Sequence, residues 1–573
     1  MEKALFDKKL KEKLLKIMLE SRLGDHREQS MIRQGKGWFH ISSAGHEAMA
    51  AVGVQLEADD YCAPYYRDRA MVLAKGMSTR GMALNFLGKK EASSAGRQLP
   101  SHYSDRSLNI WSHASPVGSH LLPACGIAWG IQLDGKKNVV IASLGEAASR
   151  QGDFYESVCI AKEKKLPVIF IVEDNKLGIS TSNVESSPLA IEALNVADWE
   201  KVDASDTEAV YNASQKAIKK ARSGEGPSFL WMDLERLDSH SSADDHRNYR
   251  DEEELSQMLE RCPIRLLKED LIASGDLTQE DFEDLEKKLK EQVRADYLGA
   301  NKSADPTPED TVVQLFEEDQ EPEKAPVELG EKSRMVEAVN LTLRAAIEKD
   351  PDTIIYGQDV EDPKGGVFKL TAGLSSDFPQ NVFNAPVAES TIVGLACGLG
   401  AYGKRPVFEI QFVDFISPAW NQLVSNLATI RWRTFGDWDC PVVIYAPCGA
   451  YLPGGAIWHS QTNESLFASV PGLKVVVPST PEDCANLFWT SMQAKDPILV
   501  LIPKHLMWEE QWVLKQPTAT RLGESRLVLP GKEITVVTWG NCLELVEAAS
   551  ESFDEDLLEI MICARWFPGM SKQ

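Results

Sequence analysis

The sequence predicts an α/β protein whose parallel sheets are covered by helices on both faces. Three observations support this class: short apolar runs rich in β-branched residues, helical patterns between them, and the recurrence of this alternation in both halves of the 573-residue chain. Strands that alternate with helices in this way form βαβ units. No short repeat is visible, so a solenoid is not expected. The predicted strands are Val139–Leu144, Leu166–Val172 and Ser228–Met232 in the first half, and Thr353–Tyr356, Pro406–Phe412, Pro441–Tyr445, Leu473–Val477 and Ile498–Ile502 in the second.

An acidic segment separates the two halves. Residues 305–331 contain ten acidic residues, one Lys and four Pro, which accounts for −9 of the formal net charge of −25. Proline-rich stretches with charges of one sign stay extended and solvated. We therefore expect a linker between a first domain at 1–304 and a second domain at 332–517, the alternative being a long surface loop within one domain.

A third, smaller α/β unit is expected at 518–573. It contains two predicted strands, Ile534–Thr538 and Leu557–Ile562, with a helical stretch at Leu543–Ser552 between them. One βαβ unit of about 55 residues is small for an independent parallel-sheet domain. Either this unit packs on its neighbour or the chain is a piece of something longer.

Charge and cysteine usage restrict the functional class. The 86 acidic residues outnumber the 61 basic ones, which argues against nucleic acid or an anionic membrane as the main partner. No apolar run approaches the length of a membrane span, and the charged N-terminus lacks the apolar core of a signal peptide. The ten cysteines form no C-x-x-C pair, a pattern typical of reduced thiols in a cytoplasmic protein.

Polar residues follow two neighbouring predicted strands of the first half. Gly145–Asp153 comes directly after the first of them, and Glu173–Thr181 comes directly after the second. Ligands of parallel-sheet folds bind beyond the carboxyl ends of the strands, so the two clusters should lie close together. A carboxylate, an amide oxygen and a backbone carbonyl form a hard-oxygen site that suits Mg²⁺, with phosphate oxygens completing the coordination. Small residues beside the carboxylate would let a helix N-terminus approach a diphosphate.

The two clusters resemble the thiamine-diphosphate fingerprint, in which G-[DE]-G is followed further along the chain by N-N. They are similar to the alpha subunit of 2-oxoacid dehydrogenase decarboxylase components, whose second cluster reads NNGYAIST. The resemblance implies that Glu146 and Asn175 bind Mg²⁺ through side chains and Leu177 binds it through its carbonyl. Two positions depart from the family pattern: Ala147 replaces a Gly, and Asp174 replaces the first Asn. The neighbours that the resemblance places at the cofactor are Gly145, Ala147 and Ala148.

Three further stretches of the first half resemble the same alpha subunit. Tyr65–Arg69 is similar to the family's YR segment, whose Arg binds phosphate oxygens. Ser115–Gly118 resembles the strip whose backbone holds the aminopyrimidine, and Arg236–Arg250 resembles the loop R-x-G-H-H-S-T-S-D-D-x-x-x-Y-R of the branched-chain enzymes. The residues that these stretches would place at the cofactor are Tyr66, Arg67, Ser115, Val117, Arg236 and His240.

The second half resembles the beta subunit of the same enzymes from about Met335 to Pro503. By this resemblance Glu389 is the carboxylate that bonds the aminopyrimidine and favours its imino form, which then acts as an internal base. Gln358 stands where the family has a Glu near the cofactor. The matching stretches are Gln358–Val360, Gly365–Phe368, Asn384–Ser390, Glu409–Phe415 and Trp458–Gln461.

The resemblance assigns three more residues of the second half. Gln411 and Phe415 lie in the stretch that the family places at the cofactor. His459 matches the active-site histidine of the beta subunit. Together with His240, it would stabilise the intermediate and shuttle protons during acyl transfer.

Taken as a whole, the resemblance implies alpha and beta subunits fused in one chain, with two thiamine-diphosphate-binding folds and a partial C-terminal domain of the transketolase type. The implied reaction is oxidative decarboxylation of a 2-oxoacid, most similar to the branched-chain 2-oxoisovalerate type, with thiamine diphosphate and Mg²⁺. The acyl group would pass to the lipoyl group of an acyltransferase core. Pyruvate or acetoin dehydrogenase is an alternative, and the loop His240–Arg250 disfavours a transketolase-like enzyme.

Two further expectations follow from the resemblance. The family builds its cofactor site from halves on different subunits, so a homodimer with a large interface is expected. The departures at Ala147, Asp174 and Gln358 also keep open a catalytically degenerate subunit with a structural role. The C-terminal unit is shorter than the family's domain, either as a fragment or as a natural shortening.

Overall fold

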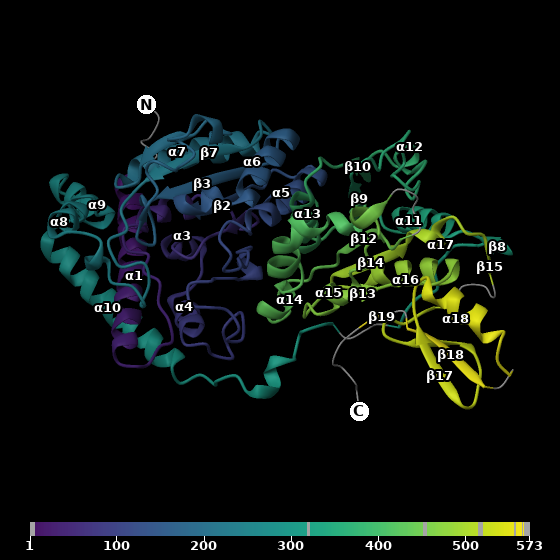
Figure 1. Cartoon of the computed structure of the whole chain (residues 1–573). Helices are drawn as coiled ribbons and strands as arrows, with labels where there is room; N and C mark the ends of the chain where they lie inside the picture. The colour runs from purple at the N-terminus through teal and green to yellow at the C-terminus, as the bar shows by residue number, and fades with distance from the viewer. Residues whose placement is uncertain are drawn as a thin grey trace. The chain divides into compact units, whose positions relative to one another are not determined.

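The chain divides into two compact units, each with its own parallel sheet (Figure 1). The computed structural model describes residues 6–317, 321–450, 455–513, 519–554, 557–563 and 565–566. The first unit is Met1–Val313 with Trp432–Trp438, and the second is Gln314–Arg431 with Asp439–Gln573. The main division therefore falls inside the acidic segment 305–331. Both ends of the predicted third unit, Thr518 and 567–573, lie outside the described residues.

The sheet of the first unit has five strands, and all neighbours in it run parallel. The apolar runs form strands because both faces are covered: consecutive residues of a strand point to opposite faces, and both kinds are buried. Ile141 and Ile169, for example, join a core cluster with residues of α1 and α7, while α5 lies against the same strands. In sheet order the strands are β1 (Tyr61–Ala63), β2 (Val140–Gly145), β3 (Val168–Asp174), β7 (Ser228–Asp233) and β6 (Glu200–Asp203).

The helices of the first unit include one long N-terminal element that matters for the site. Helix α1 is capped by Asp7, whose side chain accepts from the Leu10 N–H. Its interior Gly24, a poor helix former, leaves room for Arg69, because a Cβ there would lie 2.3 Å from that guanidinium. The helices are α1 (Lys8–Arg33), α2 (Ala50–Gly53), α3 (Arg69–Lys75), α4 (Thr79–Phe86), α5 (Leu121–Leu133), α6 (Gly152–Lys164), α7 (Thr207–Arg222), α8 (Glu252–Glu260), α9 (Pro263–Ala273) and α10 (Gln279–Ala300).

The second unit holds a seven-stranded sheet, in which only the edge strand β19 is antiparallel. Its sheet order is β10 (Val382–Asn384), β9 (Thr353–Gly357), β11 (Arg405–Glu409), β12 (Val443–Cys448), β14 (Ile498–Pro503), β13 (Lys474–Val476) and β19 (Arg565–Trp566). The main helices around it are α11 (Met335–Lys349), α13 (Glu389–Tyr402), α15 (Glu464–Ala468), α16 (Pro481–Gln493) and α17 (Lys504–Met507).

A separate three-stranded sheet follows within the second unit, where the sequence predicts a small α/β region. Its order is β16 (Ser525–Leu529), β18 (Leu558–Cys563), β17 (Ile534–Thr538), with β17 and β18 parallel. Helix α18 (Cys542–Ser550) packs on it through a small apolar cluster. Both predicted strands and the predicted helix are present here, within one or two residues of their expected bounds.

Part of the acidic segment is packed rather than solvated. Ala325, Val327 and Leu329 are buried in the core of the second unit. On the first unit, Asp305 pairs with Lys89. The alternation of apolar residues at 325, 327 and 329 explains the packing, because it gives the segment one apolar face.

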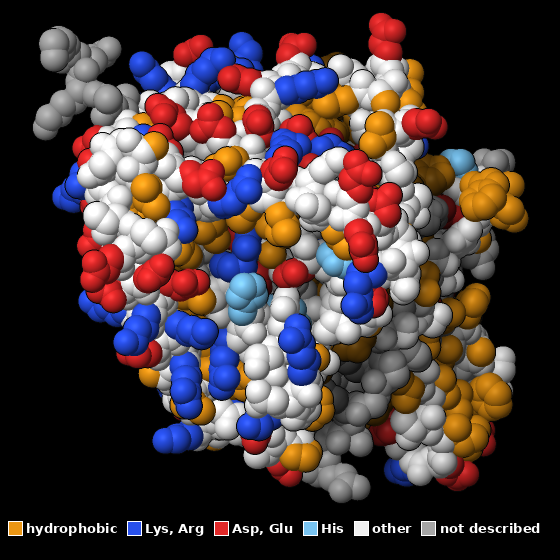
Figure 2. Space-filling view, turned by 90° about the vertical axis from the view of Figure 1, so that its left-hand side faces the viewer, with side chains coloured by type: hydrophobic (Ala, Val, Ile, Leu, Met, Phe, Trp, Pro, Cys, Tyr) orange, Lys and Arg blue, Asp and Glu red, His pale blue; other side chains and the backbone are white. Residues whose placement is uncertain are grey.

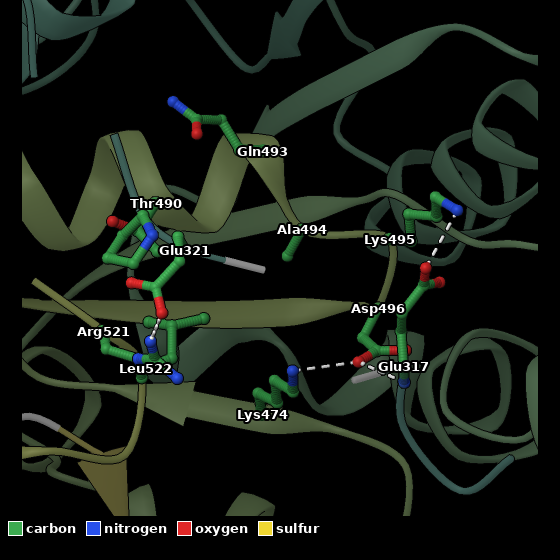
Figure 3. Close-up of a pocket in the computed structure, with 11 residues that line it drawn as sticks. Glu317, Glu321, Lys474, Thr490, Gln493, Ala494, Lys495, Asp496, Arg521 and Leu522 are labelled. Atoms are coloured by element: carbon green, nitrogen blue, oxygen red, sulfur yellow. Dashed lines mark hydrogen bonds and ion pairs between the residues drawn. The ribbon is translucent and has the colours of Figure 1, made fainter. Parts of the chain in front are cut away.

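A buried charge cluster in the second unit holds Glu317, which lies earlier in the acidic segment (Figure 3). Asp496, only 1 % exposed, pairs with Arg431 and Lys474, each at 2.9 Å, and accepts from the Glu317 N–H at 3.0 Å. Glu317 in turn pairs with Lys495 at 2.9 Å. A carboxylate between two buried cations is held far more tightly than a surface pair.

Charge on the protein surface is mixed. On the face shown in Figure 2, acidic and basic side chains are interspersed over the upper part, and basic side chains predominate over the lower left part. No helix in the described part of the chain is both long and apolar enough to cross a membrane. All ten cysteines are present as free thiols, and most of them are buried.

We expect Asp496→Ala to destabilise the second unit strongly, because it leaves the buried Lys474 ammonium without this partner. Removing one member of a buried pair costs about 3–5 kcal/mol. For a unit of this size the unfolding midpoint should fall by roughly 10 °C. Thermal unfolding of the full chain, followed by circular dichroism, measures this shift.

The matched control is Glu321→Ala, which removes an acid from the same pocket. Glu321 is 87 % exposed and pairs with Arg521, so its loss should cost less than about 1 kcal/mol. Equal midpoints for the two variants would contradict a stabilising role for the buried cluster.

Candidate active site

A cavity of about 470 Å³ lies at the carboxyl edge of the first unit's sheet. The segments after β1, β2, β3 and β7 all reach it, and the β2–β3 register places Gly145 beside Glu173. The two polar clusters that the sequence predicts as neighbours are therefore side by side. Eleven predicted residues line this cavity: Tyr66, Arg67, Ser115, Val117, Gly145, Glu146, Ala147, Ala148, Asn175, Leu177 and His240.

One corner of the cavity has the donor set of a divalent-cation site. Glu146 is 3 % exposed, and neither of its carboxylate oxygens has a hydrogen-bond partner among the described residues. Burial, together with the nearby charge of Asp174, raises the pKa of Glu146 to about 8. The buried Asn175 and the backbone of Leu177 line the same cavity. A cation bound here would be the positively charged partner that Glu146 does not have among the described residues. These residues therefore fit Mg²⁺.

A second part of the cavity suits an anion. The guanidinium groups of Arg67 and Arg236 are buried, and among the described residues neither forms an ion pair with a carboxylate. Arg67 donates to the Ser42 carbonyl and to the His240 carbonyl. Burial and the nearby Arg67 lower the pKa of Arg236 to about 10. Two buried cations that meet carbonyl groups form a local positive site in an acidic chain, which fits a diphosphate.

Arg67 also fixes the chemical form of His240. Its Nη2 lies 3.1 Å from Nδ1 of His240, and because arginine only donates, this nitrogen must be the acceptor. The ring proton is therefore on Nε2. Burial, with the charges of Arg67 and Arg236, lowers the pKa of His240 to about 4. The ring is therefore neutral at pH 7 and offers its Nε2–H as a hydrogen-bond donor.

Arg236 is the one predicted residue of this unit that does not line the cavity. Its side chain donates to the Tyr249 hydroxyl at 2.7 Å and to the Asp238 carbonyl at 3.2 Å. It therefore lies behind the loop of His240 and contributes charge there.

The methyl group of Ala147 is accommodated by a small residue opposite. A Cβ built on Gly178 would lie 3.1 Å from the Cβ of Ala147, which is tighter than ordinary contact. The NNGYAIST pattern has Ala at the position of Gly178. The family pattern has Gly opposite Ala at these two positions, whereas this chain has Ala147 opposite Gly178. The replacement of Gly by Ala147 therefore does not crowd this contact.

Sequence reasoning missed three histidines that line the same cavity. The rings of His102 and His113 stack at 4.4 Å, and His120 lies 5.7 Å from His113. His102 is 2.9 Å from the Ser115 hydroxyl, and burial lowers its pKa to about 4, so the ring is neutral. The one available signal was the recurrence of His within nineteen residues around the Ser115–Gly118 strip.

In the second unit, the predicted residues follow four adjacent parallel strands. Glu389, Gln358, Gln411 and His459 follow β10, β9, β11 and β12 respectively. Glu389 begins α13 and is half-buried in this chain. Gln358, 5 % exposed, donates to Glu389 Oε1 at 3.1 Å. An amide donor suits a carboxylate partner, whereas a glutamate at this position would compete with it for a proton.

His459 is held by aromatic rings and by its backbone. Its ring lies edge-on to Phe412 at 4.7 Å and to Phe415 at 5.2 Å. Lys504 donates to its carbonyl at 2.7 Å. The Asp414 carboxylate accepts from the backbone N–H groups of Ser460 and Gln461, which follow His459 in the chain, at 3.0 and 3.1 Å. Phe412, Asp414 and Lys504 are thus positioning groups that the sequence did not single out.

Comparisons with known proteins agree with this two-part organisation. Residues 15–309 match the family model "Dehydrogenase E1 component", and residues 331–508 match "Transketolase, pyrimidine binding domain". The chain is 40 % identical over 225 residues to 2-oxoisovalerate dehydrogenase subunit beta of Bacillus subtilis, covering 39 % of this chain and 68 % of that protein. It is 36 % identical over 250 residues to the same subunit of Pseudomonas aeruginosa, covering 40 % and 71 %. It is also 36 % identical over 230 residues to the pyruvate dehydrogenase E1 component subunit beta of Acholeplasma laidlawii, covering 40 % and 70 %.

We expect Glu146→Ala to abolish divalent-metal binding at the cavity, because it removes the only charged ligand of the predicted set. Removal of a group that only orients a metal ligand lowers metal affinity by roughly 10–100-fold. The loss of Mn²⁺ affinity in Glu146→Ala should be larger, because this variant removes a ligand itself. Electron paramagnetic resonance of Mn²⁺ with inorganic diphosphate measures it. Glu200→Ala, an exposed acid on β6, is the control, and unchanged Mn²⁺ affinity in Glu146→Ala would refute the assignment.

Proposed function

This chain belongs to the dehydrogenase E1 family of thiamine-diphosphate-dependent 2-oxoacid dehydrogenases, an alpha-type unit followed by a beta-type unit, and from this premise we propose its substrate, site and partners. The substrate is a branched-chain 2-oxoacid of the 2-oxoisovalerate type. The acyl group formed by decarboxylation passes to the lipoyl group of an acyltransferase core. The protein acts as a homodimer in the cytoplasm.

One observation carries the proposal: the cavity of the first unit joins Glu146, a buried carboxylate without a hydrogen-bond partner among the described residues, to the buried guanidinium of Arg67, with the charge of Arg236 behind it. A metal ion satisfies the first and a diphosphate satisfies the second. Thiamine diphosphate with Mg²⁺ is the cofactor that supplies both. When bound, it provides a thiazolium that takes up the electron pair released with CO₂.

The chain's own residues have separate tasks in this proposal. Glu146, Asn175 and the Leu177 carbonyl hold the metal, and Arg67 neutralises the diphosphate. Glu389 accepts a hydrogen bond from the aminopyrimidine, and Gln358 keeps its carboxylate in place. The neutral His240 donates a hydrogen bond through Nε2–H, and His459, beside two phenylalanine rings, is the proton carrier.

The branched-chain substrate is supported by three features. The loop Arg236–Arg250 is similar to that of the branched-chain alpha subunits, and two of the relatives above are 2-oxoisovalerate dehydrogenase subunits. The cavity lining also includes apolar side chains, among them Phe39, Ile41 and Ile179. A branched aliphatic side chain suits such a lining better than the single methyl group of pyruvate.

A substrate panel tests the proposed reaction. The purified chain, with thiamine diphosphate and Mg²⁺, should reduce a dye acceptor with 2-oxoisovalerate at least tenfold more efficiently in kcat/KM than with pyruvate or acetoin, because added methyl groups contribute about 10–200-fold in an apolar pocket. A preference for pyruvate or acetoin would overturn the substrate. If calorimetry with millimolar thiamine diphosphate shows no heat of binding, the proposal that this chain is an enzyme is overturned. That result would favour a structural subunit.

Glu389→Ala tests the role of the second unit. Loss of this carboxylate should lower kcat by about 10²–10⁴-fold, the usual weight of acid–base assistance. Binding of the diphosphate group should persist, since Glu146 and Arg67 are untouched. Calorimetry and dye reduction measure the two quantities. Glu337→Ala, a half-exposed acid in the first turn of α11, is the control. Full activity in Glu389→Ala would exclude the assigned role.

A further inference from the structure

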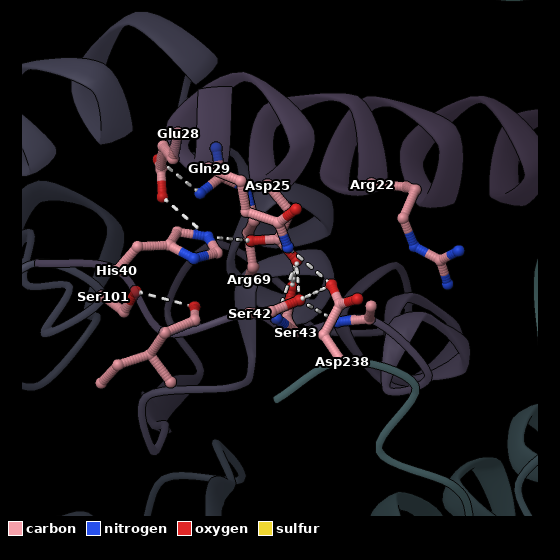
Figure 4. Close-up of polar contacts among 12 residues, drawn as sticks. Arg22, Asp25, Glu28, Gln29, His40, Ser42, Ser43, Arg69, Ser101 and Asp238 are labelled. Carbon is pink, nitrogen blue, oxygen red and sulfur yellow. Dashed lines mark hydrogen bonds and ion pairs between the residues drawn. The ribbon is translucent and has the colours of Figure 1, made fainter. Parts of the chain in front are cut away.

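A buried carboxylate of α1 holds the segment that forms one wall of the cavity (Figure 4). Asp25 is 1 % exposed. Its Oδ2 accepts from the Ser43 N–H at 2.7 Å and from the Ser43 hydroxyl at 2.9 Å, and it lies 3.2 Å from the Ser42 hydroxyl, which shares its one proton with the Asp238 carboxylate. Its Oδ1 lies 3.3 Å from Nε2 of His40. Four donors from residues 40–43, which we call the strap, converge on one carboxylate.

The strap in turn holds the loop that carries His240. The Ser42 hydroxyl lies 2.7 Å from the Asp238 carboxylate. The Ser242 N–H donates to the His40 carbonyl at 2.8 Å, and the His40 N–H donates to the Ser242 hydroxyl at 3.1 Å. This loop is thus bound to the strap on both sides of His240.

The strap also meets Arg67. The Ser42 carbonyl accepts from this guanidinium, which then reaches His240. Two residues further along, Arg69 donates to Glu28 at 2.8 Å, one turn beyond Asp25 on α1. Helix α1 therefore anchors the Arg67 segment through two carboxylates.

Three residues of this cluster are spaced like metal ligands, but their oxygens already have other partners. Asp25, Glu28 and His40 offer ligand atoms within 4.8 Å of one another. However, the Asp25 oxygens already face four donors, and Glu28 is paired with the Arg69 guanidinium. A cation would have to displace these donors, so we treat the cluster as a structural network.

We propose that Asp25 is a positioning residue for the cofactor site: through the strap it sets the places of Arg67 and His240 and thereby the affinity for the diphosphate. This inference rests on the proposed function for its ligand. Its geometric part, the attachment of the His240 loop to α1, stands on the contacts alone.

The histidine of the strap gives this attachment a pH dependence. Burial by itself lowers the pKa of His40, but the hydrogen bond and charge of Asp25, together with the charge of Glu28, outweigh it and raise the pKa above its ordinary value. A histidine whose pKa is raised in the folded state contributes its full stabilisation when the pH is below its unfolded-state pKa. This stabilisation is lost as the pH rises through its folded-state pKa. The charged groups around His40 are Asp25 and Glu28 on α1 and Arg69 on α3, with Arg33, Asp238, Asp244 and His246 in the adjoining cavity.

Asp25→Asn tests the inference. The variant should weaken Mg²⁺–thiamine diphosphate binding about tenfold or more, because four donors lose a charged acceptor. Its loss of affinity with rising pH should begin at a lower pH than in the wild type, since His40 loses its main counter-ion. Hydrogen exchange at the Ser242 amide, measured without cofactor, should become at least about tenfold faster, the factor that corresponds to 1.4 kcal/mol.

Ser42→Ala is the milder second variant, which removes only the hydroxyl between Asp25 and Asp238 and should show the same exchange effect in weaker form. Asp206→Asn is the matched control, because this carboxylate also accepts two backbone N–H bonds, at the start of α7. Wild-type exchange and cofactor affinity in Asp25→Asn would overturn the inference. Failure of the wild-type chain to bind thiamine diphosphate would instead overturn the proposed function, while the exchange measurement would still decide whether Asp25 holds the loop.

Discussion

The parallel direction of the strands is the constraint on which the candidate site residues of each unit depend. In a parallel sheet every strand delivers its following residue to the same edge, and the backbone ladder fixes the spacing of those residues. The pairs Gly145–Glu173 and Gly357–Glu409 are in register in the two sheets. Chemistry-bearing side chains from distant parts of the sequence therefore meet at one edge of each sheet.

Burial then determines which charges the site can hold. An acidic chain with a net charge of −25 still presents a locally positive site, because Arg67 and Arg236 meet carbonyl groups in the protein interior. The same burial lowers the pKa of His102 and His240 and raises that of Glu146. Local desolvation, rather than overall composition, therefore determines the charge states in the cavity.

The sheets and the residues that line the cavity of the first unit could be predicted from the sequence because their signals are local. A β-branched run followed by a polar cluster marks both a strand and the edge where a ligand binds, as at Glu146 and Asn175. The strap and Asp25 left no such signal, because a carboxylate within an amphipathic helix has the pattern of an ordinary surface residue. The short strands Tyr61–Ala63 and Glu200–Asp203 were missed since neither has a long apolar run. The acidic segment was predicted to be solvated from its charge, although the spacing of Ala325, Val327 and Leu329 already fits a packed edge.

The covalent joint at residues 305–331 has a consequence for how the protein is made. An enzyme built from separate alpha and beta subunits depends on two translation products in matched amounts, and any surplus subunit leaves an incomplete site. Here each round of translation delivers one unit of the dehydrogenase E1 type and one unit of the transketolase pyrimidine-binding type. The residues that join them also complete the apolar core of the second unit, so cleavage of the joint would cost folding stability as well as stoichiometry.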